Sequence, residues 1–285
     1  MDRKVAFVTG ASRGIGRAIC LALADRGYDV VVTARTVREG DGVARSSSFR
    51  KAKEVAIAGS VEGTAELVRQ RGREALPLRL DLLERPSIDV AVDEAVRQWG
   101  SIDVLVNNGI YQGPGVMDRF LDVPLDAAER IFQGNFFAQI HLLRQVLPRM
   151  IARGSGTIID ITSTSAYADP PGPVGSGGWG FAYGASKGAF HRLAGILHAE
   201  HAGDGVRVFN VDPGYTPTET MRALHGGGTD LDQAYGGATP EVTAAAVAWL
   251  ASEPDAEKWR GKCVQAQRLC RDLALVPGWP PARPA

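Results

Sequence analysis

Short apolar runs alternate with longer, helically periodic segments along almost the whole chain. Short apolar runs that end in glycine or polar turn residues are typical of strands buried on both faces. Seven such runs occur, at residues 5–8, 29–33, 75–80, 104–106, 157–161, 207–211 and 263–265. Between them, apolar residues spaced three and four apart predict helices over 18–23, from 61 onward, and over 89–99, 135–151, 185–201 and 241–251.

This alternation predicts an α/β fold. Strands joined through helices form a parallel sheet with right-handed crossovers and with helices on both faces. No internal repeat and no linker separates the apolar segments. We therefore expect residues 1–285 to form a single doubly wound domain around a parallel sheet of about seven strands.

Two long segments interrupt the alternation. Residues 37–60 are polar and exceed the usual length of a loop, so this segment is either functional or mobile. Since its acidic residues partly balance its basic ones, we interpret it as a solvated loop. Residues 215–238 contain two glycine clusters, at 226–228 and 236–237, and the apolar Met221 and Leu224, which together predict a hinged substrate lid. The stretch 167–182 is also expanded, and its role stays open.

Composition and charge exclude several classes of function. The 32 Lys and Arg residues balance 32 Asp and Glu residues, which argues against broad electrostatic binding to nucleic acid or to a membrane surface. The three cysteines are too scattered for a disulfide framework, and no metal-ligand spacing occurs, so we expect no metal site. No run reaches about 20 apolar residues, and the first residues carry no export pattern. We expect a cytoplasmic protein.

Three glycines separate the first strand from the first helix, in the sequence Thr9-Gly10-Ala11-Ser12-Arg13-Gly14-Ile15-Gly16. Glycines at such a turn let the backbone approach a ligand, and the helix N-terminus presents free N–H groups to a pyrophosphate. A purely structural turn is the alternative for an isolated glycine triplet. The strand–loop–helix context favours a dinucleotide site, although the spacing is one residue wider than the usual fingerprint.

Other polar clusters follow the carboxyl ends of later strands, where doubly wound sheets bind their ligands. These clusters contain Arg35, Asp81, Asn108, Ser163 and the pair Pro213-Gly214. Because all of them lie at the same edge of the predicted sheet, their coincidence is stronger evidence for a site than any one of them.

Tyr183 and Lys187 lie four residues apart on a predicted helix and so share one face. A nearby ammonium favours the ionised form of a phenol, which makes the tyrosine a useful proton donor or acceptor. Such a pair also arises by chance on many helices. Ser163 could equally satisfy backbone groups at a strand end, and Asn135 could cap or bend a helix.

With these motifs in this order, the chain resembles the classical short-chain dehydrogenase/reductase family over nearly its whole length. The matching residues are the glycine loop, Asn107-Asn108-Gly109, Asn135, Ser163, Tyr183-x-x-x-Lys187 and Pro213-Gly214. The resemblance implies a Rossmann-type fold and NAD(P)-dependent interconversion of an alcohol and a carbonyl. The family's Asn-Asn-Ala-Gly motif departs here to Asn107-Asn108-Gly109-Ile110, which changes the floor of the nicotinamide site.

The resemblance also assigns roles to four catalytic residues. Tyr183 is the acid/base, and Ser163 hydrogen-bonds the substrate oxygen. Lys187 binds the nicotinamide ribose and lowers the pKa of Tyr183, while Asn135 holds a water in the proton relay. The expected cofactor-binding residues are Gly10, Ser12, Arg13, Gly14, Ile15, Gly16, Arg35, Thr36, Asp81, Leu82, Asn108, Gly109, Tyr183, Lys187, Pro213, Gly214, Thr216 and Thr218.

The turn after the second strand predicts NADP rather than NAD. It reads Thr33-Ala34-Arg35-Thr36 and lacks the carboxylate that commonly accepts from the ribose hydroxyls of NAD. Arg35, and Arg13 from the glycine loop, can bind the additional phosphate of NADP. The alternative is that both arginines are solvated surface residues.

We therefore expect an NADP-dependent oxidoreductase that interconverts a small or medium carbonyl and a secondary alcohol. A catalytically silent dinucleotide-binding sensor or scaffold is the alternative, and epimerisation on the same scaffold is a third possibility. Apolar residues beyond one helical stripe, Phe136, Phe137, Phe190 and Leu197, predict a homo-oligomer, a dimer or a tetramer. Residues that could line an apolar substrate pocket are Tyr111, Trp179, Phe181, Tyr215, Met221, Leu224 and Tyr235.

Overall fold

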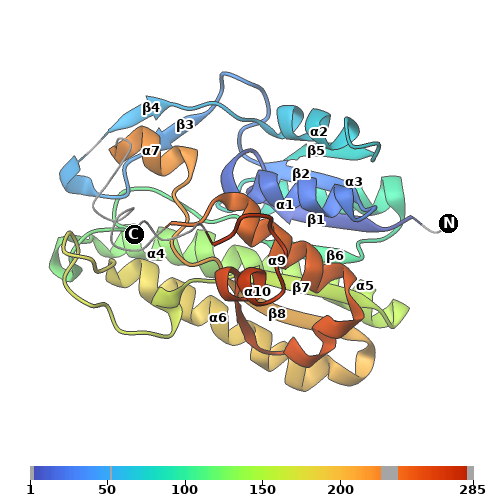
Figure 1. Ribbon diagram of the computed structural model, residues 1–285. Helices are drawn as coiled ribbons and strands as arrows, with labels where there is room; N and C mark the ends of the chain where they lie inside the picture. Colours follow the sequence, from blue (N-terminus) through green and yellow to red (C-terminus); the bar gives the residue numbers. More distant parts are fainter. Residues whose placement is uncertain (1–2, 52, 226–236, 281–285) are drawn as a thin grey trace.

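A seven-stranded parallel sheet forms the centre of the computed structural model, which describes residues 3–51, 53–225 and 237–280. Its strands are β1 (Val5–Thr9), β2 (Asp29–Ala34), β5 (Ala75–Arg79), β6 (Val104–Asn107), β7 (Gly156–Ile161), β8 (Val206–Asp212) and β9 (Cys263–Gln265). Their spatial order is β5-β2-β1-β6-β7-β8-β9, so the chain reverses direction across the sheet after β5 (Figure 1). The predicted doubly wound, Rossmann-type sheet is confirmed, and all seven strands lie where the apolar runs placed them.

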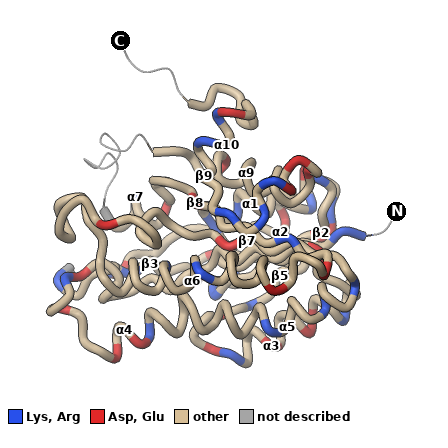
Figure 2. The backbone as a smooth tube through the Cα atoms, turned by 90° about the horizontal axis from the view of Figure 1, so that it is seen from below, with Lys and Arg blue, Asp and Glu red and all other residues tan. Residues whose placement is uncertain are grey.

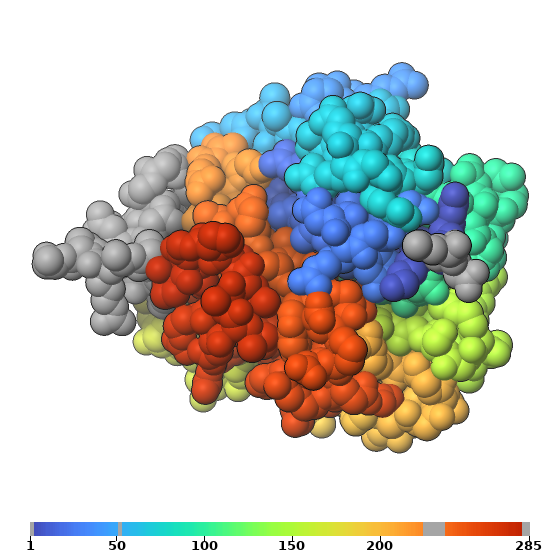
Figure 3. Space-filling view, turned by 45° about the vertical axis from the view of Figure 1, so that its right-hand side comes forward, coloured from blue at the N-terminus to red at the C-terminus, as the bar shows by residue number. Residues whose placement is uncertain are grey.

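Helices cover both faces of the sheet. On one face lie α1 (Gly14–Asp25), α2 (Val61–Arg69), α9 (Pro240–Ser252) and α10 (Ala266–Asp272). On the other lie α3 (Arg85–Trp99), α5 (Ala138–Arg153) and α6 (Phe181–His201). Alternate strand residues separate the two cores, because Val104 and Val106 face α1 and α9 while Leu105 faces α3 and α5. In Figure 3, α1 in blue and α9 in orange-red lie side by side at the surface, although more than 200 residues separate them.

Residues 37–60 form a small antiparallel hairpin instead of the expected solvated loop. Its strands are β3 (Val43–Arg45) and β4 (Glu54–Ala56), joined through the short helix η1 (Phe49–Lys51). Ala44 is buried between two exposed neighbours, and Arg45 pairs with Glu54 at 2.7 Å across the hairpin. Strands of three residues have too little alternation for a sequence pattern to reveal them.

The predicted lid of residues 215–238 is described only in part. Its first half includes the short helix α7 (Glu219–His225), which packs against β3 and β4 (Figure 1). The glycines at 226–228, Tyr235 and Gly236 lie outside the described residues.

The segment before α5 contains one more helix and a local irregularity. After the short helix η2 (Phe120–Asp122), helix α4 (Leu125–Phe132) runs through a π-helical turn, η3 (Gln133–Phe137), into α5. The predicted helix over 135–151 is therefore longer, and Asn135 occupies the π turn. The remaining short helices are η4 (Thr164–Ala166), η5 (Ala202–Asp204) and η6 (Pro254–Trp259).

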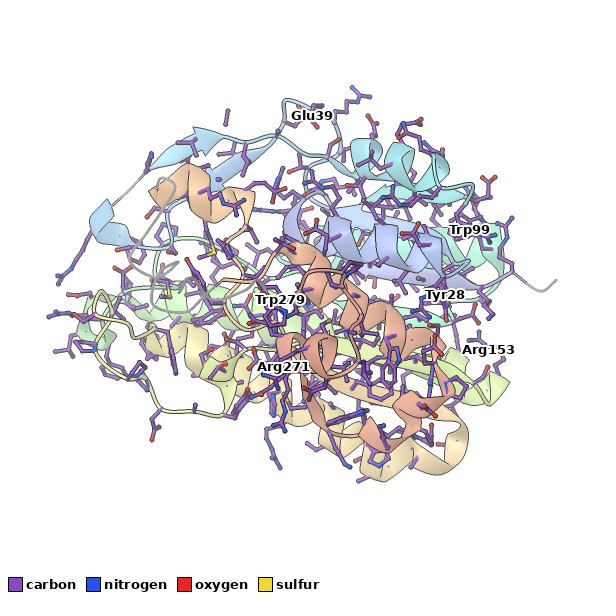
Figure 4. All side chains as sticks on the ribbon, viewed as in Figure 1. Tyr28, Glu39, Trp99, Arg153, Arg271 and Trp279 are labelled. Carbon is purple, nitrogen blue, oxygen red and sulfur yellow. The ribbon has the colours of Figure 1, made fainter. Side chains whose placement is uncertain are left out.

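Basic and acidic residues are interspersed along the described backbone (Figure 2). In the parts of the chain that the structure covers, no helix has the length and hydropathy to cross a bilayer. Tyr28, Trp99 and Arg153 lie at the end of the molecule opposite to the hairpin (Figure 4). There, the Tyr28 hydroxyl donates to the Ala251 carbonyl at 3.1 Å and joins the start of β2 to α9.

Candidate functional site

A cleft of about 1690 Å³ opens where β1, β2, β5, β6, β7 and β8 reach their carboxyl ends. Every residue predicted to contact the cofactor lines this cleft, from Gly10 in the glycine loop to Thr218 before α7. Ser163 lines it as well, whereas Asn135 does not. The position agrees with the rule that ligands of doubly wound sheets bind at this edge.

The glycine loop is packed too tightly for side chains at two positions. A Cβ on Gly16 would lie 2.2 Å from the Gly10 carbonyl oxygen, and a Cβ on Gly10 would lie 2.7 Å from Gly109 Cα. Gly10 also has a φ of +64°, which disfavours residues with a side chain. These glycines bring the loop against β6 and place the N-terminus of α1 in the wall of the cleft, where a pyrophosphate could reach its free N–H groups.

Thr9 and Asn108 fasten the glycine loop to the end of β6. The Thr9 hydroxyl accepts from the backbone N–H groups of Asn108 and Gly109, at 3.0 and 2.9 Å. The Asn108 amide donates to the carbonyls of Thr9 and Gly10, at 2.9 and 3.2 Å. The side chain of Asn108 therefore holds the cradle together, and any contact of Asn108 with a ligand is additional to this structural task.

The two predicted phosphate-binding arginines differ in their surroundings. Arg13 Nε donates to the Ala58 carbonyl at 2.9 Å, and its Nη2 donates to the Gly59 carbonyl at 2.6 Å and to Thr36 Oγ1 at 3.4 Å. Burial lowers the pKa of Arg13, and the nearby charge of Arg35 lowers it further. Arg35 is exposed and makes no hydrogen bond or ion pair with a described residue. Two adjacent guanidinium groups, one of them without a partner there, suit an anion at this end of the cleft.

Acidic side chains also lie near the glycine loop. Glu219 of α7 accepts from Arg17, and its Oε2 would lie 3.5 Å from a Cβ on Gly14. Glu39, labelled in Figure 4 between β2 and β3, accepts from the Gly59 backbone N–H at 2.8 Å. Both carboxylates raise the pKa of Arg13 against the effect of its burial.

Ser163 and Tyr183 meet at the other end of the cleft. Ser163 follows β7 and caps η4, where its Oγ accepts from the Ser165 backbone N–H at 3.2 Å. The Tyr183 hydroxyl is hydrogen-bonded to Ser163 and Ser165, which both lower its pKa. The structure thus supports both interpretations of Ser163, as a local cap and as a partner of the tyrosine.

Lys187 lies one turn after Tyr183 in α6 but is directed into the protein. Its side chain is almost fully buried, and Nζ donates to the Ile161 carbonyl at 2.7 Å. Burial lowers the pKa of Lys187 to about 8, whereas Asp160 and Asp212 both raise it. Burial also raises the pKa of Tyr183, and Lys187 is not among the groups that shift it. The sequence predicted that Lys187 lowers the pKa of Tyr183. In the structure this pKa is raised instead, because desolvation of the phenol outweighs the effect of the neighbouring groups.

Asn135 lies behind the cleft and not in it. Its Oδ1 accepts from the Tyr111 backbone N–H at 2.7 Å, and its Nδ2 donates to Ser186 Oγ at 3.3 Å. Ser186 Oγ in turn donates to the Tyr183 carbonyl at 3.0 Å. In this structure the Asn135 side chain fixes the Tyr111 loop and the first turns of α6. π turns are frequent at functional sites because they redirect side chains in this way.

Asp212 is a site residue that the sequence interpretation did not select. Its Oδ2 accepts from Thr164 Oγ1 at 2.7 Å and from the Tyr167 hydroxyl, and its Oδ1 accepts from the Gly214 N–H at 2.9 Å. This buried carboxylate lines the cleft and raises the pKa of both Tyr183 and Lys187. Its position just before Pro213-Gly214, at the end of a strand, was the available signal.

The hairpin closes the outer end of the cleft. Residues 43–48 line it, and Asp118, from the loop before η2, connects the hairpin to the opposite wall. The buried Asp118 carboxylate accepts from Ser48 Oγ, from the Phe49 N–H at 2.8 Å and from the Gly115 N–H at 3.1 Å. Lys53 Nζ donates to the carbonyls of Ala223 and Leu224 near the end of α7. The segment predicted as a solvated loop is thus a wall of the site.

The predicted apolar pocket is found in part. Tyr111, Trp179, Tyr215, Met221 and Leu224 line the cleft. Phe181 does not, since its ring packs edge-on against Phe120 at 4.8 Å. Tyr235 lies outside the described residues. The cleft is thus lined by apolar side chains as well as by the Ser163–Tyr183 pair, which suits a ligand with a carbon skeleton and a polar oxygen.

The residues present fit a dinucleotide. The tight glycine turn, the α1 N-terminus in the cleft wall and the exposed Arg35 lie on one side, and Lys187 lies beside Tyr183 on the other. Over residues 3–51, 53–225 and 237–280, no three His, Cys, Asp or Glu side chains gather as a metal ion would require.

Comparison with known proteins agrees with this geometry. The chain matches the family model for short chain dehydrogenases over residues 4–68 and 40–226. An uncharacterised oxidoreductase of Methylorubrum extorquens is 31% identical over 274 residues, which cover 93% of this chain and 97% of that protein. A solved metagenomic short-chain oxidoreductase in complex with NADP is 27% identical, with a TM-score of 0.69 over 93% of this chain and 96% of that one.

A more distant solved structure shows the same fold. A 7α-hydroxysteroid dehydrogenase complexed with NADH and 7-oxo glycochenodeoxycholic acid has a TM-score of 0.73 at 24% identity, over 93% of this chain and 92% of that one. The family match and the relative that covers 93% of the chain show that this protein belongs to the short-chain dehydrogenase/reductase family and is an NAD(P)-dependent oxidoreductase.

Proposed function

We propose that the protein is an NADP-dependent reductase or dehydrogenase that interconverts a carbonyl and a secondary alcohol, with Tyr183 as its acid/base. The observation that carries this proposal is the convergence of Ser163, Tyr183 and Lys187 at one end of the cleft whose other end is formed by the glycine loop and Arg35. A catalytically silent sensor would have no need of a buried lysine beside a tyrosine and serine that are hydrogen-bonded together.

The chain's own residues account for the proton chemistry. A bound nicotinamide supplies or accepts the hydride. Reduction of a carbonyl builds negative charge on its oxygen, which Ser163 and Tyr183 stabilise by donating hydrogen bonds. Tyr183 then gives its proton to that oxygen, and in the opposite direction it takes the proton from the alcohol. Lys187, which lines the cleft beside Tyr183, would hold the nicotinamide ribose.

Asn135 has a supporting role in this proposal. Its side chain holds the Tyr111 N–H and, through Ser186, the backbone of Tyr183. It thereby positions the acid/base, and the π turn in which it lies gives it the inward direction that this requires. We also propose that Asn135 takes part in a water relay, and only the family resemblance supports this role.

The preference for NADP rests on Arg35. It is exposed at the cleft, it lies near Arg13, and no carboxylate occupies the turn after β2. The metagenomic relative solved with NADP is consistent with this preference. Replacing Arg35 with Asp should lower kcat/KM with NADPH by about 10- to 100-fold, since a charge-assisted hydrogen bond contributes about 1.5–3 kcal/mol. Arg38→Asp is the matched control, because Arg38 is exposed and pairs loosely with Glu62 at 3.9 Å. Equal losses with NADPH and NADH would remove Arg35 from this role.

The proposed activity is tested with a panel of ketones, aldehydes and secondary alcohols, followed by the absorbance of the reduced cofactor. On a validated substrate, Tyr183→Phe should lower kcat by about 10²- to 10⁴-fold, the usual contribution of a general acid, while cofactor binding is retained. Tyr28→Phe is the control, since it removes a hydroxyl that does not line the cleft. Turnover by Tyr183→Phe at the wild-type rate would refute the acid/base role. Cofactor binding without turnover of any member would favour the silent sensor.

Three further proposals concern the whole molecule. We keep residues 1–285 as one cofactor-binding and catalytic domain, supported by the one sheet and its two helical layers. We keep a cytoplasmic location, consistent with three free cysteines in the described structure. We also keep a homo-oligomer, supported by exposed Phe137 and Ile196 on the η3–α5 and α6 helices. Phe190 is buried within its own chain and cannot contribute to an interface.

A further inference from the structure

A row of polar side chains crosses the sheet directly behind the catalytic helix. Asn107, Asp160 and Asn210 are neighbours in register on β6, β7 and β8. The row two residues earlier, Leu105, Ile158 and Val208, belongs to the apolar core under α5 and α6. Because side chains two residues apart share a face of a sheet, the polar row faces α5 and α6 as well. Three polar residues therefore interrupt an otherwise apolar face at its carboxyl end.

These three side chains are almost completely buried, and their hydrogen bonds are incomplete. Asn107 Nδ2 donates to Asp160 Oδ1 at 2.8 Å, and Asn210 Nδ2 donates to the His191 carbonyl of α6 at 2.8 Å. Asn107 Oδ1, Asp160 Oδ2 and Asn210 Oδ1 find no donor among the described residues. Burial of a carboxyl with one unpartnered oxygen costs free energy unless a charged or polar group lies near it.

Lys187 supplies an opposite charge that acts on Asp160, although no hydrogen bond or ion pair joins the two side chains in the described structure. Its Nζ binds the carbonyl of Ile161, the residue that follows Asp160 in β7, so the lysine reaches the strand that carries the carboxyl. An ammonium has three donors, of which the described structure uses this one. Among the groups that favour the charged form of Lys187, Asp160 has the largest effect on its pKa. The charge of Lys187 in turn favours the ionised form of Asp160, against the burial that raises the pKa of this carboxyl to about 7.

The other charged and titratable groups around Lys187 lie toward the cleft. Asp212 at the end of β8 also favours its charged form, and Tyr183 lies one turn earlier on α6. The Phe190 ring lies 5.5 Å from Nζ. His191, near Arg192 and Asp212, binds Thr162 Oγ1 at 3.0 Å. Asp212 is already held by Thr164, Tyr167 and Gly214, so Asp160 is the carboxyl that keeps an unpartnered oxygen.

We propose that Asp160 is a positioning residue whose buried carboxylate is the counter-charge that keeps Lys187 in its ammonium form. It acts through Lys187 and touches neither substrate nor cofactor. The proposal rests on the proposed function for the role of Lys187, but the charge coupling itself does not depend on any reaction. The competing explanation is that Asp160 only bridges Asn107 across two strands, as an asparagine would do equally well.

The coupling is tested directly by NMR on protein labelled with ¹³C at lysine Cε. The chain has six lysines, and Lys187→Arg identifies the signal of Lys187. In Asp160→Asn, the shape and the acceptor for Asn107 are kept while the charge is removed. Loss of the opposite charge of Asp160 should lower the titration midpoint of Lys187 by about one pH unit. Asn210→Ser is the matched control, since it alters the same buried row without changing its charge, and should leave the midpoint unchanged.

An unchanged midpoint in Asp160→Asn, or an equal change in Asn210→Ser, would overturn the proposal. Should Asp160→Asn not fold, the wild-type titration decides, because two coupled groups impose two inflections on the Lys187 signal. A single inflection would then refute the coupling.

A second readout connects the coupling to turnover. In carbonyl reduction with NADPH, the basic limb of the kcat/KM profile should lie at lower pH in Asp160→Asn than in the wild type, because Lys187 loses its proton earlier. A uniform loss of rate at every pH, with no displacement of the limb, would indicate a merely structural role. If no substrate is turned over but the lysine midpoint still falls, the proposed function fails while the charge coupling stands.

Discussion

The carboxylate of Asp118 should decide whether the hairpin stays closed over the cleft. It is buried at 2% exposure and accepts hydrogen bonds from Ser48, Phe49 and Gly115. Two of these donors are backbone N–H groups, one in the hairpin and one in the opposite wall. Asp118→Ala removes the shared acceptor and leaves both N–H groups without a partner.

The expected cost follows from these contacts. A hydrogen bond to a charged group contributes about 1.5–3 kcal/mol, and an unsatisfied buried N–H costs about 1–3 kcal/mol. The measured cost should be smaller than the sum of these contributions, because the hairpin can open by itself and let water hydrogen-bond the freed N–H groups. The remaining Met117 N–H to Ser47 carbonyl bond, at 2.8 Å, continues to hold the hairpin. We expect a loss of about 2–4 kcal/mol in the free energy that keeps the hairpin closed. This corresponds to about 30- to 700-fold more opening.

Limited proteolysis measures this opening. Trypsin cleaves after Arg45, Arg50, Lys51 and Lys53, all within the hairpin. When the hairpin closes faster than trypsin cuts, the cleavage rate follows the population of the open form, so cutting at these sites should be faster in Asp118→Ala by the same factor. The thermal midpoint of the whole protein should change much less than the local opening does.

Asp122→Ala is the matched control. Asp122 binds Arg50 of the same hairpin at 2.5 Å, but Arg50 is 62% exposed, and such surface pairs contribute at most about 1 kcal/mol. Its cleavage should rise about fivefold or less. If Asp118→Ala were cleaved no faster than Asp122→Ala, the carboxylate would not hold the hairpin and the reasoning would be wrong.

Three further predictions concern the glycine loop and the thiols. Gly16→Ala should weaken cofactor binding at least about 10-fold while the fold is retained, since its Cβ would lie 2.2 Å from a carbonyl oxygen; an unchanged dissociation constant by fluorescence titration would contradict this. Glu219→Gln should tighten cofactor binding about two- to fivefold at low salt, because it removes a negative charge beside the expected pyrophosphate site; weaker binding would contradict it. Burial raises the pKa of Cys263 to about 12, that of Cys270 to about 11 and that of Cys20 still further, so each thiol stays neutral at pH 8. A disulfide reagent should therefore modify the folded protein at least about 100-fold more slowly than the unfolded chain, and rapid labelling at pH 8 would refute the burial argument.

Several tertiary features could not be predicted from the sequence, because the sequence patterns that encode them are short or involve residues far apart in the chain. The β3–β4 hairpin has strands of three residues, and it is held by Asp118 and by α7, which are far away in the sequence. Asp160 lies within the apolar run 157–161, and the sequence alone gives a charged residue at this position no partner. Only the register of three strands places it in a polar row behind Lys187.

Electrostatics also depended on the structure. The spacing of Tyr183 and Lys187 correctly placed both on α6, but it led us to expect a lowered pKa for Tyr183. Burial raises that pKa instead, because the cost of ionising a desolvated phenol depends on everything packed around it. Asn135 was likewise selected from its motif, while the direction of its side chain follows from the π turn.

The sequence by itself determined the sheet, its two helical layers and the edge at which the cleft opens. These follow from local patterns, since an apolar run ended by glycine becomes a buried strand and a periodic segment becomes a helix that covers it. The glycine loop could also be predicted from the sequence, because adjacent residues determine its backbone conformation. Only the tertiary structure decided which carboxylates face Lys187, how the hairpin closes the cleft and which way the pKa of Tyr183 moves. Those properties arise from desolvation and from contacts between segments far apart in the chain, which no local pattern encodes.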